Sequence, residues 1–118
     1  MKIEPIPFYY ETINRNAIVV RPKKPFFDWV NSIYKESEPI EERYEYNIYL
    51  VRERDSNEET LSWLKRNFHG IFKNELNDWI IDESKWPSKR TYKEFSEWFD
   101  VDICSMILDL EDLEITKD

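Results

Sequence analysis

Apolar residues recur along the chain with two spacings, and the shorter spacing predicts three strands. Residues 17–20 form a short β-branched run that is typical of a buried strand. Pro22 ends this strand, and its start is left open as far back as Thr12. Residues 44–52 alternate between apolar and polar side chains, which predicts a half-buried strand. Residues 101–110 are apolar on both faces, which predicts a central strand or one covered on both sides.

The longer spacing predicts three helices. Pro25 suits the first turn of a helix that ends before Pro39. Ser56 and Glu59 form a capping box, and a long helix with one continuous apolar stripe follows. Thr91 and Glu94 form a second capping box before a short helix. We expect the long helix to pack through Leu64, Phe68, Ile71, Phe72 and Leu76 against Val19, Ile48, Leu50, Met106 and Leu108 of the sheet.

The order of these elements is β-α-β-α-α-β, which predicts an α+β fold: a small three- to four-stranded sheet with helices packed on it. The 118 residues suit one globular domain, 1–118, with an extended arm at 1–15 and a polar tail at 111–118. Aromatic residues make up 16% of the chain, more than a small core is expected to absorb. The single glycine, Gly70, excludes glycine-rich phosphate-binding loops.

Charge is distributed unevenly. The net charge is −8, and residues 92–118 hold nine acids and two bases. This end is either a solubilising tail or an acidic docking surface for a basic protein partner. Nucleic acid is not expected as a partner, because phosphates would be repelled on average. The one opposing feature is the basic stretch of residues 15–24, which contains Arg15, Arg21, Lys23 and Lys24.

The cellular compartment follows from what the chain lacks. Cys104 is the only cysteine, so the chain has no internal disulfide, as is usual in a reducing compartment. The start of the chain has no apolar stretch like that of a signal peptide, and no apolar run approaches the ~20 residues that span a bilayer. We therefore expect a cytoplasmic protein with no membrane partner.

No catalytic constellation is recognisable, so we predict no catalytic residue, metal site or cofactor. His69 lies on the polar face of the long helix and has no evident partner. Cys104 lies on an apolar face of a strand, where a free cysteine acts as a small hydrophobe. Asp100 and Asp102 share one strand face, which fits a polar strand entry better than a Mg²⁺ site.

The most distinctive segment, residues 79–91, concentrates tryptophans, acids and an arginine between two helices. In the structural interpretation Trp86 folds back as a lid, and Arg90 pairs with Asp82 or Glu83 to pin the loop. In the functional interpretation Trp86 and Arg90 anchor an interface. We favour the structural role, because Pro87 stiffens the turn. The candidate binding residues are Trp79, Asp82, Glu83, Trp86 and Arg90.

The same segment carries a family resemblance. Trp79, the Asp82-Glu83-Ser84 run, Trp86-Pro87 and Trp98-Phe99 lie within a longer pattern over residues 68–110. The pattern resembles small uncharacterised bacterial proteins with a domain of unknown function, and residues 16–34 belong to it as well. The resemblance covers most of the chain and implies no activity and no site.

Two functions remain open at this point. The leading hypothesis is a non-enzymatic interaction module that masks a basic partner, as an immunity-type protein masks a toxin. The alternative is a small enzyme or ligand-binding domain with a pocket between the sheet and the loop of residues 79–91. In the alternative, Arg90 with Asp82 or Glu83 supplies the polar groups of the pocket.

Overall fold

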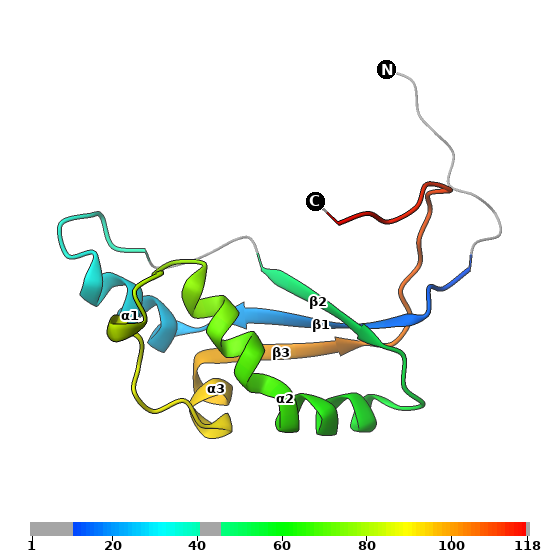
Figure 1. The fold of residues 1–118 in the computed structure, drawn as a ribbon, viewed down its shortest axis with the longest axis horizontal. Coiled ribbons are helices and arrows are strands. Elements are labelled where there is room, and N and C mark those ends of the chain that lie inside the picture. The colour runs from blue at the N-terminus through cyan, green and yellow to red at the C-terminus, as the bar shows by residue number, and fades with distance from the viewer. Residues whose placement is uncertain (1–10, 41–45, 118) are drawn as a thin grey trace, which may run out of the picture.

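In the part of the chain that the structure describes, the protein is an α+β fold in which three α-helices accompany a three-stranded antiparallel sheet (Figure 1). The structure is a computed structural model that describes residues 11–40 and 46–117. The predicted element order, β-α-β-α-α-β, is confirmed. The elements are β1 (Arg15–Pro22), α1 (Lys24–Ile33), β2 (Asn47–Arg52), α2 (Asn57–Asn77), the short 3₁₀ helix η1 (Glu83–Lys85), α3 (Tyr92–Trp98) and β3 (Phe99–Cys104).

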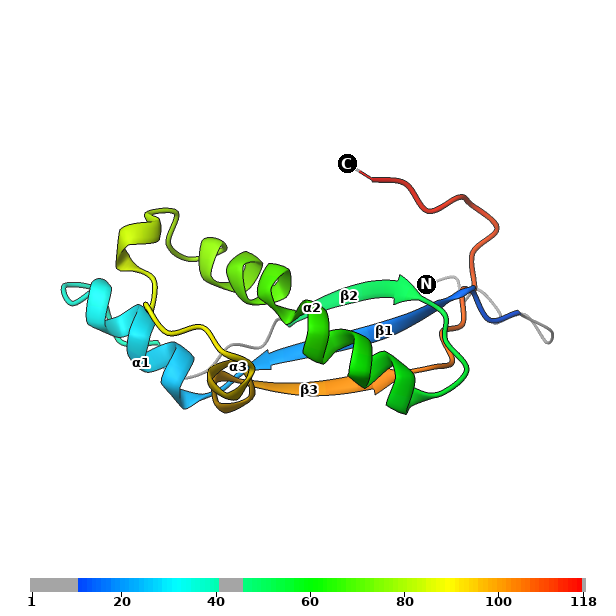
Figure 2. The same ribbon diagram turned by 60° about the horizontal axis from the view of Figure 1, so that its bottom comes forward.

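The strand order is β2-β1-β3, so the first strand is the central one (Figures 1 and 2). The prediction that residues 101–110 form a central or doubly covered strand is wrong, because β3 lies at an edge and ends at Cys104. Beyond it, Leu108 forms only an isolated bridge with Thr12. The continuous apolar run of residues 17–20 occupies the central position instead, while Asp100 and Asp102 of the edge strand are exposed.

Helices α2 and α3 cover one face of the sheet and leave the other open, while α1 packs against α3 beyond the end of β1 (Figure 2). Asn16, Ile18 and Val20 of β1 are buried on the helix side, while Val19 lies on the opposite face. We call that opposite side the open face of the sheet. On β3 the helix side carries Phe99, which is buried.

The predicted orientation of β2 is wrong. The strand alternates as expected, but Ile48 and Leu50 lie on the open face and are 61% and 47% exposed. Asn47 and Tyr49 face the helices instead, because a buried carboxylate on α2 accepts hydrogen bonds from both of them. Val19 on the open face is only partly buried. Met106 and Leu108, beyond β3, are 73% and 44% exposed, so neither is a core residue.

The helix half of the predicted core is confirmed. The predicted stripe of α2 from Leu64 to Leu76 is buried. It meets an aromatic cluster whose rings pack mostly edge to face or tilted, at centroid distances of 5.2–5.7 Å for Phe26, Phe72 and Phe95 around Phe99. The core thus contains many of the aromatic residues that were expected to exceed what a small core can bury.

Both predicted capping boxes begin helices. The Ser56 hydroxyl accepts from the amide of Glu59 at 3.2 Å, and the Glu59 carboxylate reaches back to the amide of Asp55 at 3.3 Å. The Thr91 hydroxyl accepts from the amide of Glu94 at 3.3 Å. These caps fix where α2 and α3 begin, and α3 runs directly into β3. Of the predicted extended arm, residues 1–10 lie outside the described residues.

Candidate functional site

The structure brings Trp86 and Arg90 together. The Trp86 indole donates to the Ile80 carbonyl at 2.7 Å, and its ring packs against the core. Arg90 donates to the Pro87 carbonyl at 2.7 Å, and its guanidinium lies over the Trp86 ring at 5.8 Å from the centroid. Both side chains are half-buried. These contacts tie the loop to itself, in the way that a structural role requires.

Among the other candidate binding residues, Glu83 accepts from the amide of Trp86 through its backbone carbonyl at 3.1 Å. Asp82 accepts from the amide and the hydroxyl of Ser84, at 3.0 and 2.7 Å, and these bonds hold the pKa of Asp82 below its usual value. Glu83 is exposed. Trp79 packs edge to face against Phe26, with 6.3 Å between the ring centroids. Among the ion pairs of the described residues none involves Arg90, so its expected pairing with an acid is not formed.

A buried carboxylate that the sequence analysis missed lies between α2 and β2. Glu75 is 1% exposed and accepts from the Tyr49 hydroxyl and from the Asn47 amide, the latter at 2.6 Å. Burial, followed by the bond to Glu75, raises the pKa of Tyr49 above its usual value. Asn47 also donates to Asp78 at 2.8 Å. The signal in the sequence was the position of Glu75, which falls on the apolar stripe between Phe72 and Trp79.

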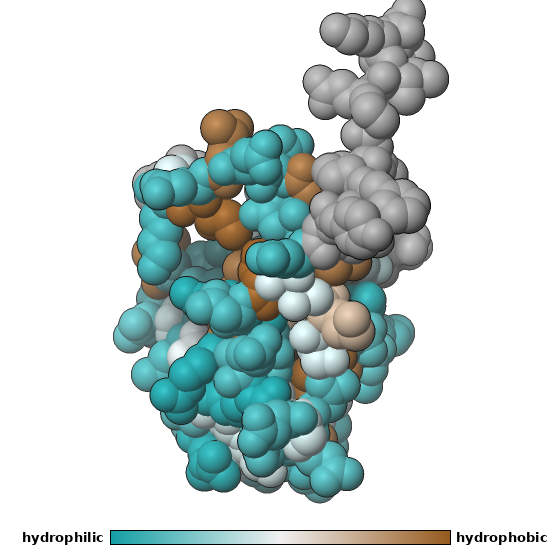
Figure 3. All heavy atoms as spheres, turned by 90° about the vertical axis from the view of Figure 1, so that its right-hand side faces the viewer, coloured by the Kyte–Doolittle hydropathy of each residue, from teal (hydrophilic) through white to brown (hydrophobic). Residues whose placement is uncertain are grey.

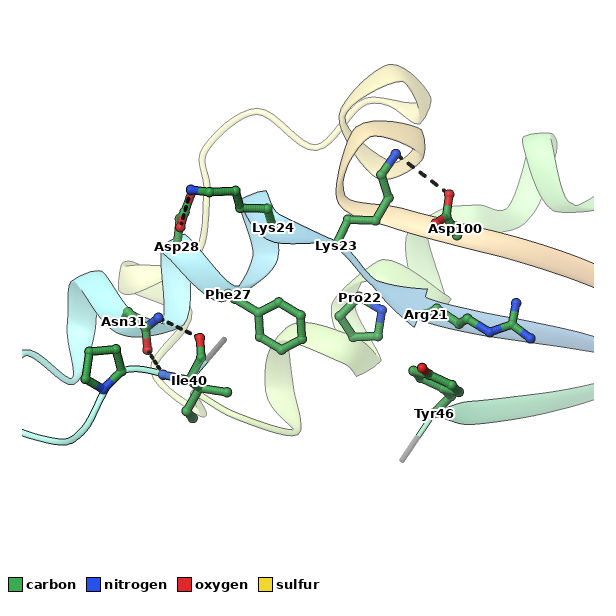
Figure 4. A pocket seen from close by; sticks show the side chains of 11 residues that line it. Arg21, Pro22, Lys23, Lys24, Phe27, Asp28, Asn31, Ile40, Tyr46 and Asp100 are labelled. Atoms are coloured by element: carbon green, nitrogen blue, oxygen red, sulfur yellow. Dashed lines mark hydrogen bonds and ion pairs between the residues drawn. The ribbon is translucent and has the colours of Figure 1, made fainter. Parts of the chain in front are cut away.

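The basic stretch lies beside a hollow of about 850 Å³ where β1 meets α1 (Figure 4). Lys23 lies 3.8 Å from Asp100, and Lys24 lies 2.9 Å from Asp28. Arg21 forms an ion pair and hydrogen bond with Asp102, which raises the pKa of the guanidinium. Each of these three cations therefore already has a carboxylate, which reduces the attraction of this hollow for phosphate groups.

A second candidate surface lies at the end of the chain. The predicted polar tail is acidic, but it is interleaved with large apolar side chains that solvent reaches, including Leu113 at 79% and Ile115 at 68% exposure. Together with Leu50 and Ile13 these residues border a hollow of about 660 Å³. Figure 3 shows this end of the molecule, where hydrophobic and hydrophilic atoms alternate around an opening.

We define the C-terminal surface by two sets of residues. The apolar set is exposed and begins just beyond β3. The acidic set alternates with it along the same segment. The C-terminal surface consists of Met106, Leu108, Leu110, Leu113 and Ile115, with Asp109, Glu111, Asp112 and Glu114.

The remaining chemical candidates lie on α2 and on β3. His69 is exposed on α2, as expected, and Cys104 is exposed at the end of β3 rather than buried on an apolar face. Asp100 and Asp102 are exposed on the open face. Over residues 11–40 and 46–117 no cluster of three or more His, Cys, Asp or Glu side chains has the arrangement of a metal site.

Comparisons with protein-family models, with curated proteins and with solved structures find no match for this chain. The resemblance over residues 68–110 therefore stays a prediction. Within the described part of the chain, no helix has the length and apolarity needed to cross a bilayer. A functional proposal for this protein rests on its own surfaces.

Proposed function

We propose that this protein is a non-enzymatic interaction module that docks a protein partner with a basic surface on its C-terminal surface. The observation that carries the proposal is the exposure of five large apolar side chains in a segment of acids. Leu113 and Ile115 border one hollow, and exposed apolar side chains gathered in this way are typical of interaction sites. When a partner covers them, each fully buried Leu, Ile or Met side chain contributes about 1.5–3 kcal/mol.

The charge of the C-terminal surface indicates what kind of partner it binds. Residues 105–117 contain four acids and a single base, Lys117. A surface that is apolar and acidic complements one that is apolar and basic, and this complementarity speeds encounter and discriminates against acidic proteins. Binding covers the partner's basic patch, so the expected consequence is that the partner is masked.

The same segment has a competing interpretation as a solvated tail. A solubilising tail needs only charge, and the alternation of apolar and acidic residues from Leu108 to Ile115 exposes apolar side chains that such a tail does not need. The alternative of a ligand pocket beside residues 79–91 draws less support. The three hollows bordered by Arg21, by Leu61 and by Leu113 have no lining residue from that loop.

The test uses a photo-crosslinking amino acid at position 113 in the full chain, expressed in its native host. Crosslinked proteins are identified by mass spectrometry, and each is purified and titrated against the protein by calorimetry at two salt concentrations. The matched variants are a Leu113→Ser and Ile115→Ser double variant and Ile81→Ser. Ile81 is 82% exposed but lies outside the C-terminal surface.

The proposal predicts a partner with a basic surface whose affinity falls with salt. The double variant should weaken this affinity at least tenfold, while Ile81→Ser leaves it unchanged. An acidic partner would contradict the proposal, as would equal affinities for the double variant and Ile81→Ser. Recovery of no specific crosslinked protein would also count against it.

A further inference from the structure

The outer edge of β3 has a defined hydrogen-bonding phase. The amide of Lys23 donates to the Trp98 carbonyl at 2.8 Å, and these two residues continue the β1–β3 register by one position beyond Pro22 and Phe99, as a hydrogen-bonded pair. Such pairs alternate along an antiparallel ladder. Asp100, Asp102 and Cys104 therefore bond to β1, while the backbone groups of Val101 and Ile103 point away from it. Pro22 is consistent with this alternation, because it lies opposite Phe99 at a non-hydrogen-bonded position, where no amide proton is needed.

No further strand of residues 11–40 or 46–117 pairs with this edge, since β3 ends the sheet order (Figure 2). The amides and carbonyls of Val101 and Ile103 thus form an unused ladder of two donors and two acceptors. An edge of this kind is a template for another extended chain.

A groove of about 460 Å³ runs beside the edge on the helix side. Its walls come from the first two turns of α2, from α3 and from β3 itself. Leu61, Tyr92 and Ile103 are half-buried, and Phe95 forms the buried floor. The groove therefore offers apolar contacts next to the unused backbone groups.

The charged side chains beside this edge are acidic. Glu58 borders the groove on the helix side, and the carboxylates of Asp100 and Asp102 lie on the open face of β3. Asp100 and Asp102 each have one cation on β1, but both ion pairs are exposed, and exposed pairs stabilise a protein by only about 0–1 kcal/mol. Their carboxylates can accept a second cation from the other side, because each has about four lone-pair sites.

We infer that the β3 edge binds an extended segment of a partner protein as an added antiparallel strand with alternating apolar and basic side chains. Residues of the segment opposite Val101 and Ile103 place apolar side chains in the groove. Residues opposite Asp100 and Asp102 place basic side chains on the open face, where cross-strand pairs of opposite charge are favourable. This inference goes beyond the proposed function, because it uses a different surface and stands without it.

A second copy of this chain is the main competing occupant. Pairing two β3 edges antiparallel would bring the carboxylates of Asp100 and Asp102 from both copies to the same stretch of sheet. Like charges across a strand pair are destabilising, and each copy also carries a net charge of −8. A basic segment removes both penalties, so the charge of the edge favours it.

The probe is a fluorescein-labelled heptapeptide in which valine and lysine alternate, measured by fluorescence anisotropy against the full protein. Two further peptides are N-methylated, one at every valine and one at every lysine. In an added antiparallel strand the valine amides face β3 and the lysine amides face solvent. Non-specific attraction of a cationic peptide to an acidic protein is the same for both methylated peptides. The difference between their affinities therefore measures the contribution of backbone hydrogen bonds to β3.

The inference predicts that valine methylation weakens binding at least tenfold and that lysine methylation changes it less than threefold. On the protein side, Ile103→Pro removes an outward amide and should weaken binding at least tenfold. Ile48→Pro is the matched control, because by the same alternation Ile48 points its amide outward at the β2 edge. Circular dichroism establishes that both proline variants fold, and the methylated peptides test the edge if one of them does not.

Three results would overturn the inference. The first is equal binding of the two methylated peptides. The second is peptide binding that survives Ile103→Pro but is lost in the Leu113→Ser and Ile115→Ser double variant, which would place the peptide on the C-terminal surface. The third is a dimer in sedimentation equilibrium that Ile103→Pro dissociates, which would make a second copy the occupant. These results do not decide the proposed function, because that proposal is tested by a crosslink at position 113, on the C-terminal surface.

Discussion

The carboxylate of Glu75 holds β2 against α2 from inside the protein, and removing one of its donors measures that attachment. The Tyr49 hydroxyl and the Asn47 amide both donate to the same oxygen of Glu75. Tyr49→Phe deletes the hydroxyl and keeps the ring that packs on the core. The perturbation thus removes hydrogen bonds without opening a large cavity.

The magnitude follows from the charge of the acceptor. A hydrogen bond to a charged group contributes about 1.5–3 kcal/mol, against about 0.5–1.5 kcal/mol for a neutral pair. Because Asn47 still donates to Glu75 in the variant, we expect a loss of about 2 kcal/mol in the free energy of unfolding. Asn74 also loses an acceptor, since its amide donates to the Tyr49 hydroxyl at 2.8 Å.

Urea unfolding at neutral pH gives the comparison, and Tyr34→Phe is the matched control. The Tyr34 hydroxyl donates to the neutral Trp79 carbonyl at 2.8 Å, and the side chain is 44% exposed. Its loss should be below about 1 kcal/mol. If the two variants are equally stable, the buried charge does not strengthen the Tyr49 bond and the reasoning is wrong.

The same bond predicts a response to alkaline pH. The folded-state pKa of Tyr49 is raised above its value in the unfolded chain, which is about 10. A raised pKa contributes stability that is fully present below the unfolded pKa and is lost as pH rises through the folded pKa. Wild type should therefore lose more stability than Tyr49→Phe above about pH 10. Parallel loss in both proteins would refute this.

Two further predictions concern the core and the charge. Phe72→Ala should cost about 3–5 kcal/mol in unfolding free energy, whereas Met106→Ala should change it by less than about 0.5 kcal/mol, which thermal unfolding of both variants checks. In a gel-shift assay at low salt, random duplex and single-stranded nucleic acid should migrate unretarded at micromolar protein, because Arg21, Lys23 and Lys24 are already paired with carboxylates. Retardation that Lys23→Ala and Lys24→Ala abolish would show that these ion pairs do not screen the basic stretch from phosphates.

Helix positions were predictable because their determinants are local. The Ser56 cap and the stripe from Leu64 to Leu76 are both read from residues three or four apart, and the structure confirms both. The residues that determine the orientation of β2 are not local. A strand with Ile48 and Leu50 on one side and Asn47 and Tyr49 on the other looks apolar on the first side, and only a buried partner on another element reverses it.

The role of Glu75 as this buried partner could not be predicted from the sequence, for a physical reason. A glutamate within an apolar stripe is ordinarily assigned to the helix boundary, because an unpaired buried carboxylate is costly. Glu75 is tolerated because donors from β2 reach it, and those donors are 26 and 28 residues away in sequence. In the loop of residues 79–91 the hydrogen bonds of the Trp86 indole and of Arg90 span six and three residues, whereas the packing of Trp86 on the core and the absence of the expected Arg90 ion pair depend on the tertiary fold.

The distribution of charge in the fold also changes which acids are available to a partner. Residues 92–118 appear uniformly acidic in the sequence, but the antiparallel pairing of β1 with β3 places Arg21 and Lys23 beside Asp102 and Asp100. The basic stretch and part of the acidic end thus offset each other within the sheet. The acids without such a strand partner follow β3, among the exposed apolar side chains from Leu108 to Ile115. We therefore expect a basic partner to be attracted most strongly to the C-terminal surface, while at the β3 edge backbone pairing adds to the weaker attraction of Asp100 and Asp102.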